Sequence, residues 1–243
     1  MSGHSKWNNI KRKKEGTDAK RAQTFTRIGR EMAVAIKEGG ADPVANSKLR
    51  DVIAKAKANN VPNDNIQRML SKYTSEGGAD YETVVYEGYG PEGVALIVEA
   101  MTDNRNRTAS SIRHIFDKYG GNMGAQNSVS WQFERKGVIV IDREEFEDEE
   151  DDMMMIAVDA GAEDFEASEE AFEITTSVDT LGEVRDNLEK QGYTFAAAEE
   201  QMIPQNTVKI TDEENVKKFQ KLLDMLEEDD DVQNVWHNWE DAD

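Results

Sequence analysis

The residues best suited to chemistry in this chain are basic, and they gather near its beginning. Lysine and arginine neutralise phosphates and release counterions, which gives salt-sensitive affinity, and an indole stacks on an unpaired base. The segment therefore predicts an arm that contacts nucleic acid, although a solvated tail with its tryptophan folded back onto the helices is the alternative. The candidate contact residues are Lys6, Trp7, Lys11, Arg12, Lys13, Lys14, Lys20, Arg21 and Arg27.

A second candidate site lies in the segment 102–108, with the sequence TDNRNRT. Asn104, Arg105 and Arg107 stand where a helix is expected to begin, and free backbone N–H groups there already favour anions. This pattern indicates a site for a phosphate or for an RNA backbone. The equal alternative is that Asp103 or Asn106 caps the helix while the arginines pair with acidic residues nearby.

The chain offers little for catalysis, metal binding or cofactor binding. Its three histidines have no spacing to serine, aspartate or one another that suggests a triad or a metal site. The acidic run 144–152 has no glycine to turn it into a calcium loop, and the GYGPEG sequence at 88–93 is followed by a strand pattern, so it predicts a hairpin turn instead of a dinucleotide site. We therefore expect no catalytic residue, no metal, no cofactor and no enzymatic activity.

Charge is distributed very unevenly along the 243 residues. The formal net charge is -21, yet residues 1–75 hold 16 Lys and Arg against seven Asp and Glu. A basic N-terminal segment followed by an acidic remainder is typical of a protein that presents one end to a polyanion. Cysteine is absent, and no apolar run approaches the roughly 20 residues of a membrane helix. These features predict a soluble, cytoplasmic protein without a membrane partner.

Three apolar stripes at helical spacing follow the basic arm. They begin near Ala22, Ala45 and Ile66, and Gly39-Gly40 and Val61-Pro62 separate them. Residues 1–78 are therefore expected to form a basic arm and a three-helix domain.

Beyond residue 78 the pattern changes to strands alternating with helices. Residues 135–204 predict the complete series βαββαβ, which is the ferredoxin-like order. The predicted strands are 137–141, 163–166, 171–176 and 193–199, and the helices are about 149–160 and 180–191. Outside this series the strands 83–87, 93–101, 128–134, 207–211 and 232–239 are expected, with helices 106–119 and 212–227.

These elements predict an α+β fold with a second ferredoxin-like domain that is split. Its two parts would be residues 79–134 and 205–243, and residues 135–204 would be inserted between them. The acidic α/β domains are expected to position the protein or to bind a protein partner.

Several motifs together resemble the YebC/PmpR family from end to end. They are Gly3-His4-Ser5-Lys6-Trp7, Asp18-Ala19-Lys20-Arg21, Pro62-Asn63-Asp64, Tyr86-Glu87-Gly88-Tyr89-Gly90-Pro91, the segment 102–108 and Ser128-Val129-Ser130-Trp131. The resemblance implies a helical N-terminal domain with two α/β domains and a cytoplasmic, DNA-binding transcriptional regulator. It also implies an alternative, because mitochondrial members of the family are translational activators and bacterial relatives have been linked to the ribosome.

We therefore expect a non-enzymatic regulator whose arm and helical domain contact phosphates, with DNA as the target. The alternative is a ribosome-associated translation factor that binds ribosomal or transfer RNA through the arm and the loop 104–107.

Overall fold

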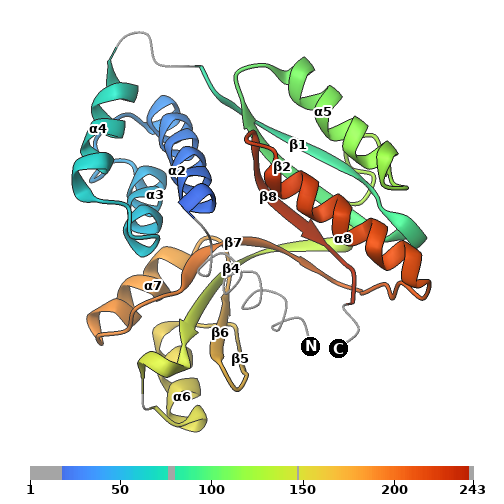
Figure 1. The fold of residues 1–243 in the computed structure, drawn as a ribbon. Helices are drawn as coiled ribbons and strands as arrows, with labels where there is room; N and C mark the ends of the chain where they lie inside the picture. Colours follow the sequence, from blue (N-terminus) through green and yellow to red (C-terminus); the bar gives the residue numbers. More distant parts are fainter. Residues whose placement is uncertain (1–17, 76–79, 147, 241–243) are drawn as a thin grey trace. The chain divides into compact units, whose positions relative to one another are not determined.

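The computed structural model describes residues 18–75, 80–146 and 148–240, with backbone only for residues 18–20. Two compact units are present, one comprising residues 22–134 and 204–243 and the other including residues 135–203. Helices and two four-stranded antiparallel sheets make the fold α+β, as predicted (Figure 1). No helix within the described ranges is both long and apolar enough to span a bilayer.

Three helices open the described chain: α2 (Asp18–Gly39), α3 (Ser47–Ala58) and α4 (Asn63–Thr74). Their predicted apolar stripes meet in one core in which Ile28, Met32, Leu49, Ala56 and Ile66 are at most 2% exposed. The side chain of Asn46 caps α3 by accepting from the Leu49 N–H, and it also donates to two carbonyls near the end of α2. This three-helix arrangement confirms the helical elements predicted for this part of the chain.

The first sheet has the order β3-β1-β2-β8, formed by β1 (Glu82–Tyr89), β2 (Ala95–Thr102), β3 (Asn122–Met123) and β8 (Val232–His237). Helices α5 (Arg105–Lys118) and α8 (Glu213–Glu228) pack on it, with Phe116, Phe219 and Leu222 fully buried against alternate residues of β2. Figure 1 shows both helices running along this sheet.

The GYGPEG segment forms the predicted hairpin turn. β1 pairs with β2 from Glu82 opposite Thr102 to Tyr89 opposite Ala95, and the short 3-10 helix Pro91–Gly93 joins them. Gly88 is required for close packing, because a Cβ there would lie 2.5 Å from the Asn122 carbonyl oxygen. Glu92 occupies the left-handed region (φ 55°), and its carboxylate accepts from the N–H groups of Thr211 and Asp212 at the start of α8.

Two strands expected in this sheet are absent from it. Polar and apolar residues alternate over 128–134 as in a strand. However, the N–H groups of Val129 and Ser130 donate to the Glu87 carboxylate, and residues 130–132 form a 3-10 turn. Residues 207–211 make only one bridge, from Val208 to Trp239. The strands predicted at 128–134 and 207–211 are therefore wrong for this sheet. The strand predicted at 83–87 is confirmed as β1, and β3 extends the sheet beyond it.

The second sheet has the order β5-β6-β4-β7, which is the ferredoxin-like order for strands connected as βαββαβ. It consists of β4 (Phe133–Asp142), β5 (Asp164–Ala167), β6 (Ala171–Thr176) and β7 (Ala197–Pro204), while α6 (Glu150–Ala160) and α7 (Leu181–Lys190) cover one face. The last strand begins four residues later than predicted, because the Tyr193 N–H closes the turn after α7 and its ring packs against Phe146.

Candidate nucleic-acid interface

The four basic residues of α3 are divided between two sides of the helix. Lys48 and Lys55 point toward α2, where their ammonium groups lie 2.7 Å from Glu38 and 2.8 Å from Glu31. Arg50 and Lys57 are seven residues apart, which places them on the same side of the helix, and both are exposed. Two cations of α3 thus form ion pairs with α2, and the other two are exposed to solvent.

Helix α4 adds Arg68 to this set of exposed cations. Ile66 is buried in the helical core, and Arg68, two residues further, is exposed on the other side of α4. Among the described residues, none forms an ion pair or a hydrogen bond with the side chain of Arg50, Lys57 or Arg68. We call these three residues the cationic face.

The arginines of α2 have a different role, because they bind the end of α8. Arg27 donates to the carbonyl of Glu227, and Arg30 donates to the carbonyl of Asp230. Burial lowers the pKa of Arg27, although nearby acidic residues oppose this effect. The Glu227 carbonyl, one of those that α8 leaves unpaired at its C-terminus, thereby gains a donor. Arg27, predicted to contact phosphate, is thus placed against the protein's own backbone.

Asp231 is the centre of a buried polar cluster that joins α2, α5 and the start of β8. Its carboxylate accepts from Arg30 at 2.8 Å, from Thr108 at 2.7 Å and from Arg107 at 2.9 Å. The side chain is only 8% exposed. Burial by itself would raise the pKa of Asp231, but the hydrogen bonds from Thr108 and Arg107 and the charge of Arg30 outweigh it, so the pKa lies below its usual value.

The segment 102–108 begins α5 as expected, and its basic residues have acidic neighbours. Asn104 caps the helix by accepting from the Arg107 N–H at 3.1 Å. Arg107 binds Asp103 and Asp231, both at 2.9 Å, and Arg105 lies 3.1 Å from Glu82. The side chains of Arg107 and Arg105 are more than half exposed, at 54% and 62%. The ion-pair part of the alternative therefore describes these arginines, whereas its capping residue was wrong, because Asn104 and not Asp103 or Asn106 caps the helix. A role in phosphate binding stays a prediction.

The remaining predicted residues lie at or before the start of α2. Lys6, Trp7, Lys11, Arg12, Lys13 and Lys14 are outside the described residues, and Lys20 is described only as part of the α2 backbone. Arg21 is exposed on the first turns of α2. Within the described chain, Arg21 is thus the residue of this predicted set whose side chain is exposed.

An exposed tryptophan marks a second ordered surface feature. The buried carboxylate of Glu87 accepts from the backbone N–H groups of Asn127, Val129 and Ser130, each at 2.8–2.9 Å. These bonds hold the loop that carries Trp131, whose side chain is 68% exposed and whose indole N–H donates to the Ser128 carbonyl. The loop therefore presents a fixed aromatic ring to solvent.

The described residues hold no group of three His, Cys, Asp or Glu side chains arranged to bind a metal ion. His114 is exposed on α5, and the ring of His237 packs edge-on against Phe219 with centroids 5.5 Å apart. Neither histidine has a geometry that suggests a catalytic base.

Comparison with known proteins gives a consistent match over nearly the whole chain. Residues 5–76 match the family described as "TACO1/YebC protein N-terminal domain", and residues 81–239 match "TACO1/YebC second and third domain".

Relatives from two bacteria share more than half of the sequence. A "Probable transcriptional regulatory protein" of Acetivibrio thermocellus is 56% identical over 240 residues, covering 98% of this chain and 99% of its own length. A protein of the same description from Thermoanaerobacter pseudethanolicus is 56% identical over 241 residues, covering 99% and 97%. The crystal structure of the conserved hypothetical protein Aq1575 from Aquifex aeolicus has a TM-score of 0.84 and 46% identity, covering 92% of this chain and 91% of its own.

Proposed function

The chain belongs to the TACO1/YebC family, and from that premise we propose that it is a non-enzymatic, DNA-binding transcriptional regulator of the cytoplasm. The observation that carries the proposal is the cationic face of Arg50, Lys57 and Arg68 on α3 and α4. The regulatory role is supported by the names of the bacterial relatives. The contact with phosphates is supported by the charge and exposure of these three side chains.

The acidic body makes the position of the cationic face significant. Residues 76–243 hold 43 Asp and Glu against 13 Lys and Arg, so most of the chain repels a polyanion. Binding is then expected at the few places where cations are exposed and form no ion pair with the protein's own carboxylates. In the described chain the cationic face meets this condition, and the predicted basic arm before α2 would extend the contact.

Replacing the cationic face by alanine tests the proposal. Each phosphate contact contributes about 0.9 to the slope of log affinity against log salt concentration. We expect the R50A/K57A/R68A variant to bind a labelled DNA duplex more weakly at every salt concentration and to lose about 2 to 3 from that slope. Fluorescence anisotropy across a salt titration measures both quantities.

A matched variant controls for the loss of three positive charges. Lys209, Lys217 and Lys221 are exposed on or just before α8, and K209A/K217A/K221A changes the net charge by the same amount. This control should keep the wild-type slope, whereas an equal loss in the two variants would mean that net charge alone governs binding. An unchanged affinity in R50A/K57A/R68A would contradict the proposal.

A further inference from the structure

Helix α6 has an apolar outer face that no described residue covers. Met153, Ala157 and Ala160 are buried against the second sheet, whereas Met154, Met155 and Val158 are 43%, 61% and 61% exposed. Because these three exposed residues are one, three and four positions apart, their side chains lie together on the side of the helix away from the buried residues. They account for half of the large hydrophobic side chains exposed in the described chain.

Acidic side chains surround this apolar face. On the helical wheel Asp151 precedes it along the same stripe, while Asp152 and Asp159 follow its edge, and all three are exposed. The unit around it has the same character, because residues 135–203 contain 22 Asp and Glu against five Lys and Arg.

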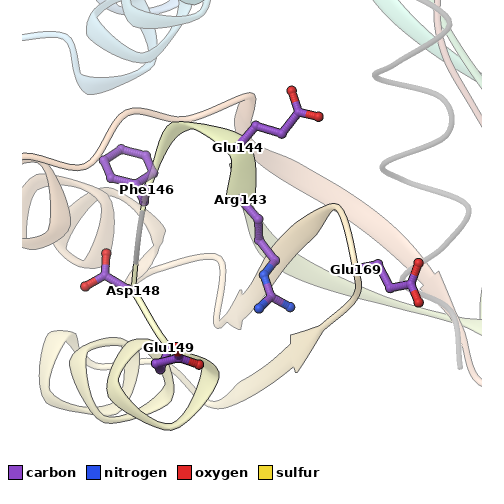
Figure 2. A pocket seen from close by; sticks show the side chains of 6 residues that line it. All are labelled: Arg143, Glu144, Phe146, Asp148, Glu149 and Glu169. Carbon is purple, nitrogen blue, oxygen red and sulfur yellow. The ribbon is translucent and has the colours of Figure 1, made fainter.

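An open hollow beside the start of α6 is also lined largely by acidic side chains. Figure 2 shows Asp148 and Glu149 at the N-terminus of the helix, Glu169 on the turn between β5 and β6, and Glu144 above them. The one basic residue of the hollow, Arg143, donates to the Ser168 carbonyl and lies 4.7 Å from the centre of the Phe172 ring. The guanidinium is therefore held against the protein, while the carboxylates of Glu144, Glu149 and Glu169 are exposed to solvent.

We propose that the outer face of α6 binds a protein partner through a helical segment that carries apolar side chains flanked by lysine or arginine. Methionine side chains are flexible and polarizable, so they adapt to the apolar side of such a segment. The aspartates at the edge and the carboxylates of the hollow are complementary to its basic flanks. A nucleic acid or an acidic segment would be repelled from the same surface.

A synthetic peptide tests this surface directly in the full-length protein. The probe is a peptide of roughly 18 residues of Leu and Lys, arranged as an amphipathic helix, and its counterpart has Glu in place of Lys. We expect the Lys peptide to bind the wild type and to bind M154S/M155S/V158S about tenfold more weakly. Isothermal titration calorimetry gives both constants, and circular dichroism verifies that the variant is folded.

Two controls separate this surface from general attraction to an acidic protein. V44S/V85S removes two exposed apolar side chains from other elements, and it should bind the Lys peptide as the wild type does. Equal affinity of the wild type and M154S/M155S/V158S for the Lys peptide would overturn the proposal. Equal binding of the Glu peptide would overturn it as well, because the acidic residues would then have no part in recognition.

Discussion

Replacing Asp231 by alanine is expected to destabilise the protein more than replacing an exposed charged residue by alanine. Asp231 accepts hydrogen bonds from Arg30, Thr108 and Arg107, and the side chains of Asp231 and Arg30 are only 8% and 13% exposed. Asp231→Ala leaves the Arg30 guanidinium and the Thr108 hydroxyl buried without this acceptor. Breaking a buried ion pair by removing one partner costs about 3–5 kcal/mol.

Urea denaturation followed by circular dichroism measures this loss. A thermal melt should show a decrease of about 6–20 °C, because each kcal/mol corresponds to roughly 2–4 °C in a protein of this length. Asp224→Ala is the matched control, since that side chain is 53% exposed and lies 3.8 Å from Lys221. Its cost should stay below about 1 kcal/mol.

The pH dependence gives an independent check on the same residue. Because the folded-state pKa of Asp231 lies below its usual value, its stabilising effect is complete above that usual value and disappears as the pH falls through the folded-state pKa. The difference in stability between wild type and Asp231→Ala should therefore shrink only in strong acid. A loss at neutral pH no larger than that of Asp224→Ala would refute the reasoning.

Three further predictions concern Glu92, Glu87 and the basic arm. Hydrogen bonds from the Thr211 N–H, the Asn215 side chain and the Asp212 N–H lower the pKa of Glu92 to about 2. In thermal melts the stability advantage of the wild type over Glu92→Gln should therefore be constant above pH 4.5 and decline toward pH 2. A difference that stays constant down to pH 2 would contradict this. Glu87→Gln removes the ionised acceptor for the N–H groups of the loop 127–130. Amide hydrogen exchange in this loop should show a free energy of local opening that is lower by about 1.5–3 kcal/mol. Unchanged exchange would show that the carboxylate does not hold the loop. Replacing the four consecutive basic residues of the arm, in the variant K11A/R12A/K13A/K14A, should reduce the salt slope of DNA binding by about 3 to 4. An unchanged slope would exclude this run as an anchor.

Much of the secondary structure could be predicted because apolar residues recur along the sequence with the period of a helix or of a strand. The strand 171–176 matches β6 residue for residue, and the apolar stripes located α2 to α8 to within a few residues. Residues 128–134 misled the prediction because Val129, Trp131 and Phe133 alternate with polar residues as in a strand, although Trp131 is exposed. The carboxylate of Glu87, about 40 residues away, takes the N–H groups that a strand would have used, and no local pattern announces that contact.

The candidate site was harder to predict because charge alone does not show which cations are already paired. The sequence makes Arg27 and Arg50 equally basic, yet Arg27 binds the end of α8 while Arg50 is exposed. The seven-residue spacing of Arg50 and Lys57 was a usable signal, but the acidic partners of Lys48 and Lys55 come from α2. Separating the two sides of α3 therefore required the tertiary structure.

Crosslinking in living cells tests the central claim most directly. The wild type and the R50A/K57A/R68A variant would be crosslinked at equal abundance, purified, and the attached nucleic acid sequenced. The account predicts that the wild type recovers DNA concentrated at promoter regions and that the variant loses most of this recovery. Recovery dominated by ribosomal or transfer RNA, or promoter recovery that the variant retains in full, would contradict it.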